Sequence, residues 1–211
     1  MNKEGNTYTL LYASILVTLV AVGLAFTAEV LHPQQSKNEA IDKMQQILAA
    51  VNVPANQSTA EALYQQTIVS TFFVDNEEQH PVFEALVGGQ KKYILALRGT
   101  GLWGPIWGYL ALNDDKNTVF GASFGHAGET PGLGAEIALP PFAARFAGKK
   151  IFNAEAKFTS IAIVKPGKSV PNKDYVDGIS GGTITSRGVD AMLYASLEVY
   201  VPFLNSEADE K

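Results

Sequence analysis

The first pattern along the chain is an uncharged apolar run near its start. Asn6 to Ala28 contains no charged residue, and the core of the run reads YTLLYASILVTLVAVGLAFTA. About 20 apolar residues, at about 1.5 Å rise each, span a hydrocarbon core of about 30 Å. Tyr8 and Tyr12 lie near one end, where interfacial aromatic residues are common. The pattern predicts a transmembrane helix with residues 8–28 in the lipid bilayer.

A cleaved signal peptide is the alternative for this run. The apolar region is longer than that of a signal peptide, and only Lys3 precedes it as a basic residue. We therefore expect an uncleaved N-terminal membrane anchor over residues 1–32, ended by Pro33, and one domain over residues 33–211. The few lysines that flank the span do not fix the side of the membrane on which the domain lies.

Beyond the anchor, the spacing of apolar residues changes between a helical and a strand-like period. Helical spacing covers residues 36–53, about 59–68, 139–147, and a last stretch from near Ser186 to Pro202. Strand-like runs lie at residues 70–75, 92–98, 106–112, 118–124 and 158–165. Glycine and Asn-Asp breaks between the runs favour hairpins. The pattern predicts an α+β fold: a single N-terminal transmembrane helix, then one domain with an antiparallel sheet and flanking helices.

Composition narrows the classes of function. With 46% hydrophobic and 18% charged residues, the chain is not disordered, and a net charge of -5 with no basic stripe argues against a nucleic-acid partner. The absence of cysteine excludes disulfides and thiolate metal sites, and three histidines argue against a multi-histidine metal site. No Ser-His-Asp order and no catalytic arrangement of paired carboxylates stands out in the sequence. We therefore expect neither a metal site nor a catalytic residue, which disfavours a flavin enzyme that acts alone.

The stretch DGISGGTITSRGVD, residues 177–190, precedes the last helical pattern. Its glycines permit tight turns and close approach of a ligand to the backbone. If the stretch is extended, Thr183 and Thr185 point the same way and Ile184 points into the core. The N-terminus of the following helix favours an anion, so a phosphate near Thr185 is one interpretation. A strand-to-helix turn with Ser186 as N-cap is the other.

Two further glycine-rich segments stand out. In GTGLWGPIWGYLAL, residues 99–112, a tryptophan flanked by glycines could stack on a planar ring; a hairpin turn with a half-buried Trp103 is the alternative. GHAGETPGLGAEI, residues 125–137, is so rich in turn formers that it is ordered only if something packs on it. Glu129 and Thr130 offer polar atoms there, whereas His126 alone is typical of a surface or hydrogen-bonded histidine.

Taken together, these three segments resemble one family. Residues 177–185 are similar to the flavinylation motif of FMN-binding domain proteins, in which Asp-x-x-Ser/Thr-Gly-Ala-Ser/Thr-x-Thr precedes a helix; Gly182 stands where that family usually has alanine. The segments GLWG, GYLAL and ETPGLGAEI resemble the C subunits of the bacterial Na+-translocating NADH:quinone oxidoreductases (Nqr type), and the anchor fits as well. The G subunits of the related Rnf complexes share the motif and the anchor. A membrane-anchored assembly module without a redox cofactor is an alternative of another class.

The resemblance implies a cofactor and a set of partners. FMN would be bound covalently, through a phosphoester to the hydroxyl of Thr185, by a separate Mg2+-dependent flavin transferase that uses FAD and releases AMP. The protein would then carry single electrons between other subunits of the membrane complex. It would lie in the bacterial inner membrane with the flavin domain on the periplasmic side.

The resemblance also assigns residues around the flavin. Asp177, Ser180, Gly181 and Thr183 would line the phosphate site or be recognised by the transferase. Leu102, Trp103, Glu129, Thr130 and Leu133 would surround the isoalloxazine. Lys165 would approach the flavin or its phosphate.

Overall fold

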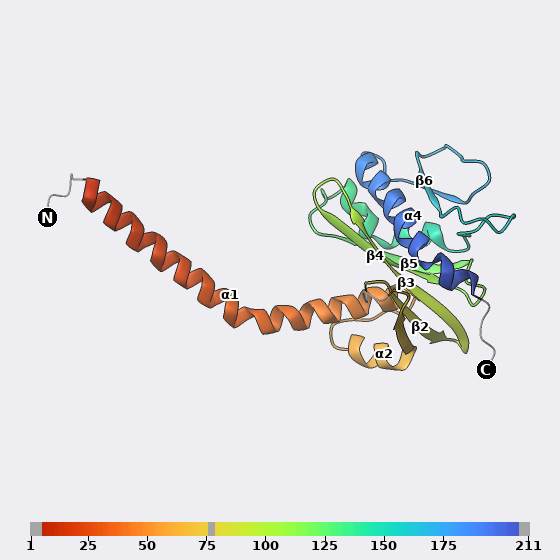
Figure 1. Cartoon of the computed structure of the whole chain (residues 1–211), viewed down its shortest axis with the longest axis horizontal. Coiled ribbons are helices and arrows are strands. Elements are labelled where there is room, and N and C mark those ends of the chain that lie inside the picture. Colours follow the sequence, from red (N-terminus) through yellow and green to blue (C-terminus); the bar gives the residue numbers. More distant parts are fainter. Residues whose placement is uncertain (1–5, 76–78, 207–211) are drawn as a thin grey trace. The chain divides into compact units, whose positions relative to one another are not determined.

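The computed structural model describes residues 6–75 and 79–206, and they divide into two compact units at Asp42 and Lys43. In chain order the elements are α1 (Asn6–Ala50), α2 (Ala60–Thr67), β1 (Ile68–Phe73), β2 (Pro81–Val87), β3 (Gln90–Thr100), β4 (Pro105–Leu112), β5 (Val119–His126), the 3-10 helix η1 (Gly134–Ala138), α3 (Pro140–Ala143), the 3-10 helix η2 (Ala144–Phe146), β6 (Ala162–Val164), β7 (Tyr175–Asp177) and α4 (Thr183–Asn205). The unit that begins at Lys43 holds the sheet and every element after α1 (Figure 1).

Helix α1 is a single element that passes through Pro33. The anchor and the helical stretch at residues 36–53 are therefore one continuous helix, whereas a break at Pro33 was expected between them. A proline removes one main-chain hydrogen bond, and strongly helical turns on both sides of it keep the helix continuous. By length and composition, the N-terminal part of α1 is apolar enough to cross a membrane, which is compatible with a single-pass anchor. The division between anchor and domain at residue 32 stays a prediction.

The sheet has five antiparallel strands in the order β1-β2-β3-β4-β5, so each strand pairs with the next one along the chain. This confirms the predicted hairpins, although β2 was missed, because PVFEALV does not alternate clearly between apolar and polar residues. Val87 pairs with Gln90, and Gly88 and Gly89 between them both have positive φ. A two-residue hairpin turn of this kind matches the twist of the strands and requires residues that tolerate positive φ.

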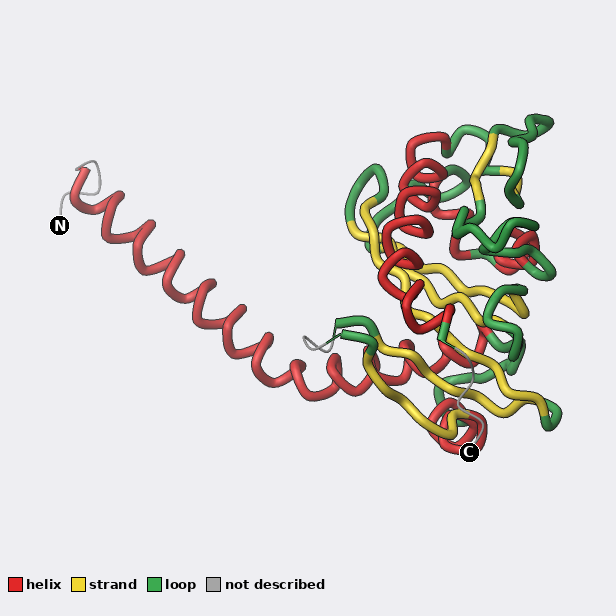
Figure 2. The backbone as a smooth tube through the Cα atoms, turned by 45° about the vertical axis from the view of Figure 1, so that its right-hand side comes forward, coloured by secondary structure: helices red, strands yellow, loops and turns green. Residues whose placement is uncertain are grey.

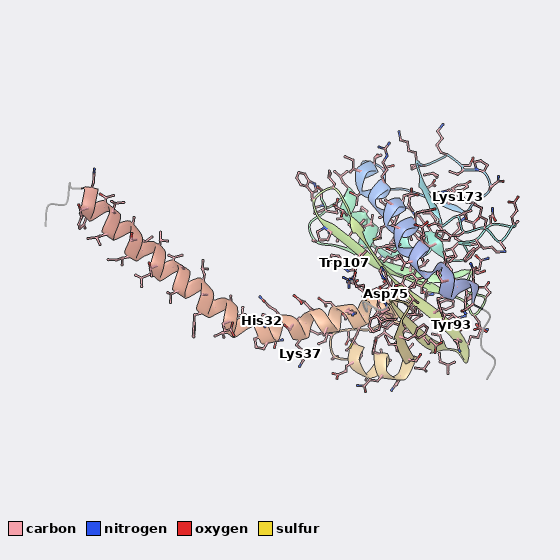
Figure 3. The ribbon with its side chains drawn as sticks, in the orientation of Figure 1. His32, Lys37, Asp75, Tyr93, Trp107 and Lys173 are labelled. Atoms are coloured by element: carbon pink, nitrogen blue, oxygen red, sulfur yellow. The ribbon has the colours of Figure 1, made fainter. Side chains whose placement is uncertain are left out.

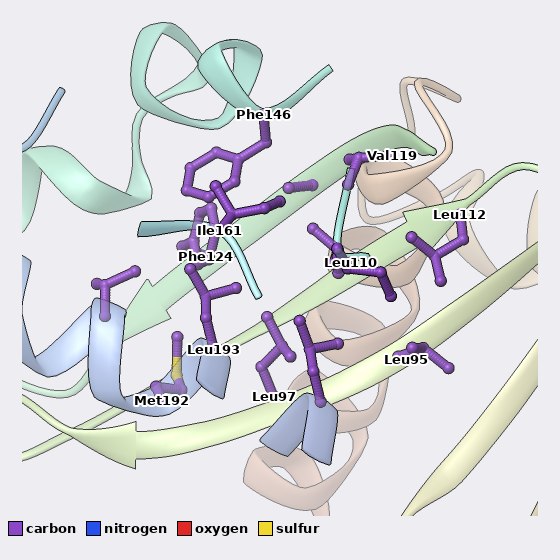
Figure 4. Close-up of a cluster of buried hydrophobic side chains, with 14 of the residues drawn as sticks. Leu95, Leu97, Leu110, Leu112, Val119, Phe124, Phe146, Ile161, Met192 and Leu193 are labelled. Atoms are coloured by element: carbon purple, nitrogen blue, oxygen red, sulfur yellow. The ribbon is translucent and has the colours of Figure 1, made fainter. Parts of the chain in front are cut away.

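One face of the sheet is covered by α4, which lies across the strands in the turned view of Figure 2. Figure 4 shows the resulting core, in which Leu193 of α4 lies among side chains of the sheet such as Leu97, Leu110 and Phe124. Phe146 of η2 and Ile161 complete this core from the side. Because α4 is buried along most of its length against the sheet, its position in the domain is fixed.

The other face of the sheet is covered by the last turns of α1. Ile47 is buried there with Phe83 and Ile94. The ring Nε1–H of Trp107, labelled on its strand in Figure 3, donates a 2.8 Å hydrogen bond to Oε1 of Gln46. The hydroxyl of Ser123 donates to the carbonyl of Gln46 at 2.7 Å. The end of α1 is thus part of the folded domain.

Strands β6 and β7 form a separate parallel pair. The predicted strand at residues 158–165 is therefore shorter than expected and does not join the antiparallel sheet. The pair is tied to α4, because the N–H of Ile163 donates to Oδ1 of Asp190 at 2.7 Å. Directly after β7, the N–H of Gly178 donates a 2.7 Å hydrogen bond to the carbonyl of Val164, the last residue of β6. From the end of β7, a short loop leads to the start of α4.

Candidate functional site

The site is built around the first turn of α4. Gly181 has a φ of 76°, a conformation that favours glycine, and Gly182 precedes the helix without any side-chain cap. The helix begins at Thr183, earlier than the predicted Ser186. Successive side chains are therefore turned by about 100° instead of alternating.

This early start corrects the predicted directions of the side chains. Ile184 is 55% exposed, whereas Thr185 is only 1% exposed. Thr183 is exposed and does not share the environment of Thr185. Ser186 is not an N-cap; its hydroxyl oxygen accepts a 2.9 Å hydrogen bond from the N–H of Ile179 and so holds the preceding loop.

The hydroxyl of Thr185 donates a 2.6 Å hydrogen bond to Oε2 of Glu129. Glu129 is itself only 5% exposed, and its Oε1 accepts a 2.9 Å hydrogen bond from the N–H of Trp103. Three segments distant in sequence thus meet at two buried side chains. They are the glycine-rich segments that the sequence singled out: the β3–β4 turn, the loop after β5, and the start of α4.

The carboxyl of Glu129 is ionised in spite of its burial. Burial by itself raises the pKa of this carboxyl, but hydrogen bonds from the Thr185 hydroxyl and from the N–H groups of Trp103 and Leu102 outweigh that effect. The result is a pKa below the ordinary value of 4.5. A buried negative charge with fixed donors therefore faces the Thr185 hydroxyl.

Two glycines leave the space that this pair occupies. A Cβ on Gly134 would lie 2.4 Å from both Oγ1 of Thr185 and Oε2 of Glu129. A Cβ on Gly101 would lie 2.4 Å from Oε1 of Glu129. Any larger residue at either position would displace the carboxylate or the hydroxyl. Sequence reasoning attributed no role to these two glycines, because only the folded loops bring them to Glu129.

Exposed apolar side chains lie on the same three segments. Trp103 is 68% exposed, and Leu102, Leu133 and Ile184 are also exposed. Leu133 lies against Gly181, where an added Cβ would come within 2.5 Å of its Cδ2. The turn that carries Leu133 is therefore packed beside the start of α4.

Thr130 begins this turn and is itself exposed. Its carbonyl accepts hydrogen bonds from the N–H groups of two later residues, Leu133 and Ala135, both 3.1 Å long. The backbone of Thr130 therefore holds Leu133 in place, and the turn needs no contact from its side chain to keep its shape.

The remaining predicted residues lie at the rim. Asp177 ends β7 with an exposed side chain, and its carbonyl accepts a 2.6 Å hydrogen bond from Arg145, a residue that the sequence did not single out. Ser180 is exposed in the loop before α4, and Lys165 is exposed directly after β6. Among the described residues, the hydrogen bonds and ion pairs found connect neither Lys165 nor Asp177 to the Thr185–Glu129 pair.

The site has the features that a flavin mononucleotide requires. The first N–H groups of an α-helix have no partner within the helix, so the uncapped start of α4 favours a phosphate. Exposed Trp103, Leu102 and Leu133 are suited to cover a planar aromatic ring. The residues present therefore fit a phosphate at the helix start and an aromatic ring against the loops.

Comparisons with known proteins agree with this geometry. The FMN-binding domain family matches residues 101–198, which contain the β3–β4 turn, the loop after β5 and most of α4. The chain is 30% identical to the C subunit of the Na(+)-translocating NADH-quinone reductase of Pseudomonas aeruginosa, over 92% of both sequences. It is 45% identical to the Vibrio vulnificus protein of the same name, over 46% of this chain and 38% of that one.

A solved structure is also similar to this chain. The crystal structure of the C subunit of the Na(+)-translocating NADH-quinone reductase from Parabacteroides distasonis is 52% identical in sequence, with a TM-score of 0.80. The match covers 84% of this chain and 98% of that one. Residues 101–198 match the FMN-binding domain family, and the chain belongs to the family of C subunits of the Na(+)-translocating NADH-quinone reductases.

Proposed function

We propose that this protein is the covalently flavinylated subunit of a membrane Na+-translocating NADH:quinone oxidoreductase, and that it carries single electrons through FMN on Thr185. A flavin supplies one-electron chemistry, and the protein supplies its attachment and surroundings. A covalent bond keeps the carrier at the site whatever the concentration of free FMN. Since the bond is to the phosphate, the isoalloxazine stays free to exchange electrons. The protein is active only with the other subunits of the complex, because one helix cannot form an ion path.

The observation that carries the choice of acceptor is the hydrogen bond between Thr185 and Glu129. Thr185 is the hydroxyl on which the three glycine-rich segments converge, at the uncapped start of a 23-residue helix. Thr183, two residues earlier, is the rival acceptor, and its exposure favours access by another enzyme. Because the carboxylate of Glu129 accepts its hydrogen bond from the Thr185 hydroxyl, we assign the phosphoester to Thr185.

Attachment requires a second protein. We infer that a Mg2+-dependent flavin transferase uses FAD as donor and releases AMP, and that Ser180, Gly181 and the exposed side chain of Asp177 are available for its recognition. α1 would hold the protein in the bacterial inner membrane with the flavin domain on the periplasmic side. Other subunits of the complex would then donate electrons to the flavin and accept them from it.

The proposal is tested on the full chain. Co-expressed with a flavin transferase and separated in SDS, the protein should give a fluorescent band near its mass of 22.6 kDa. Thr185→Ala should abolish the band and Thr183→Ala should keep it. A non-fluorescent wild-type band would contradict the flavin carrier and favour an assembly module. The opposite behaviour of the two variants would move the bond to Thr183.

The Rnf-type alternative shares the proposed flavin and differs in its partners. Cysteine-rich, ferredoxin-like proteins that co-purify with the full chain from detergent would favour the G subunit of an Rnf complex. The similarity to a C subunit over 92% of the chain supports the NADH:quinone oxidoreductase. We therefore keep that assignment for the partners.

A further inference from the structure

The Glu129 carboxylate contacts the hydroxyl of Thr185, and binding of FMN alone does not explain this contact. Bound FMN alone needs no negative charge beside its phosphate, because a carboxylate and a phosphate repel each other. Glu129 nevertheless lies at hydrogen-bond distance from Oγ1 of Thr185 and is buried with it. The contact is therefore better explained by the chemistry of attachment than by the attached state.

We propose that Glu129 is the proton acceptor for flavinylation of Thr185, an inference that rests on the proposed function. In this step, Oγ1 of Thr185 forms a bond to the phosphorus of the FMN half of FAD. The pyrophosphate bond to the AMP half breaks, and AMP leaves with the bonding electrons. The proton of the hydroxyl passes to Oε2 of Glu129, and no electron is gained or lost.

The geometry suits this role. The two oxygens are 2.6 Å apart, within the range from which a general base removes a proton. The other carboxylate oxygen is held by the N–H of Trp103 at 2.9 Å, so the group cannot rotate freely away from the hydroxyl. Protein kinases use an aspartate in the same way, to accept the proton of the hydroxyl that attacks phosphorus.

The groups around Glu129 leave its carboxylate able to accept a proton. In the described part of the chain, Glu129 forms no ion pair with a Lys or Arg. Its backbone N–H donates a 3.1 Å hydrogen bond to Nδ1 of His126. Hydrogen bonds from the Thr185 hydroxyl and from the backbone N–H groups of Trp103 and Leu102 keep the group ionised, because together they lower its pKa in spite of its burial. A base that is already deprotonated can accept the proton when the bond to phosphorus forms.

Access to the hydroxyl requires a local movement. Thr185 is 1% exposed, and Gly134 lies directly over it. Displacement of the turn at residues 130–134 would uncover Oγ1, while the bonds from residues 102 and 103 keep Glu129 in place. No equivalent carboxylate contact is found for Thr183 within residues 6–75 and 79–206, so we expect this exposed threonine to be the poorer acceptor.

The test measures the rate of attachment. Full-length protein, purified in detergent from cells without flavin transferase, is mixed with purified transferase, FAD and Mg2+, and the initial rate is read from in-gel flavin fluorescence and intact mass. Glu129→Gln keeps the size of the side chain and removes the base, so the rate should fall by about 100-fold or more. Glu136→Gln, the same substitution seven residues later in η1, is the matched control and should label within about twofold of the wild-type rate.

A second variant separates proton acceptance from shape. Glu129→Asp keeps a carboxylate but shortens the side chain, whereas Gln keeps the length; we expect the rates to fall in the order Glu, Asp, Gln. Thermal unfolding checks that each variant is folded. A Gln variant as fast as wild type, or at least as fast as Asp, would overturn the role of Glu129 and leave the proposed function intact. A wild-type protein that takes no label would overturn the proposed function itself.

Discussion

The two ends of α4 differ in the main kind of side chain that they bury. Toward its C-terminus the helix buries apolar side chains such as Leu193, Leu197 and Tyr200 against the sheet. In its first turn it buries the hydroxyls of Thr185 and Ser186, while the apolar Ile184 is exposed. Polar groups are costly to bury unless they are hydrogen-bonded, and apolar groups gain nothing from exposure.

This difference separates the part of the helix that stabilises the domain from the part that we propose binds the flavin. The hydroxyls of the first turn are satisfied by Glu129 and by the loop before the helix. Its exposed apolar neighbours are left for a ligand or a partner. Substitutions at one end should therefore change stability, and substitutions at the other end should change flavin attachment.

The largest effect on stability is expected at the buried end. Leu193→Ala removes a side chain that is fully buried between α4 and the sheet, which costs about 2–5 kcal/mol. Val199→Ala, on the exposed side of the same helix, should cost much less. Chemical denaturation measures both values. Flavin attached per folded molecule should be unchanged in Leu193→Ala; a loss of label from the folded fraction would contradict the separation of roles.

A smaller effect is expected where a glycine makes room for the polar pair. Gly134→Ala places a methyl group 2.4 Å from the Thr185 hydroxyl and from the Glu129 carboxylate, and should cost about 1–3 kcal/mol. It should also slow flavin attachment. Gly128→Ala, in the loop between β5 and η1, has no atom within 4 Å of the added methyl and serves as control. Equal stability and equal labelling rates for the two variants would show that Gly134 is not packed against Thr185 and Glu129.

The Glu129 carboxylate predicts a pH dependence of stability. Folding lowers its pKa below 4.5, so its contribution is present above that pH and is lost as the pH falls through the folded-state pKa. Glu129→Gln cannot titrate. The wild type should be more stable than this variant at pH 7 by about 1.5 kcal/mol. The gap should begin to narrow as the pH falls below 4.5 and close below the folded-state pKa. Denaturation of both proteins across this range measures the gap; a gap that stays constant would show that the charge is not the cause.

The smallest effect on stability is expected at Trp103, which is 68% exposed. Trp103→Ala should change the free energy of unfolding by no more than about 0.5 kcal/mol. If the indole covers the flavin, its removal should raise flavin emission in the native protein, since tryptophan quenches a stacked flavin. The SDS gel band should stay equally bright. Unchanged native emission would place the isoalloxazine away from Trp103.

Much of the fold could be predicted from local patterns. The antiparallel hairpins followed from runs of strand formers separated by glycines, and α3 begins at the predicted Pro140. Two proline positions misled the prediction, because α1 continues through Pro33 and α4 through Pro202. A single missing hydrogen bond does not end a helix whose neighbouring turns are stable. The parallel pairing of β6 with β7, and its hydrogen bond to Asp190 of α4, form only in the folded chain and left no signal in the local pattern.

The three segments that form the site could be predicted from the sequence, but the way they meet in space could not. Glycine and hydroxyl content drew attention to the three segments, and the resemblance joined them. The direction of Ile184 was predicted wrongly, because the helix begins at Thr183 and alternation does not apply. The contact between Glu129 and Thr185 joins residues 56 positions apart, so only the folded chain reveals it.

Peptide mass spectrometry of the flavinylated full chain can locate the flavin at a single residue and so test whether Thr185 bears it. Cleavage after Lys173 and Arg187 gives a peptide that contains both threonines, Ser180 and Ser186. Fragment ions between Thr183 and Thr185 separate the two positions. We expect the added mass of FMN, less one water, to lie on Thr185. The same mass on Thr183 or on a serine, or an unmodified peptide after complete treatment with transferase and FAD, would contradict it.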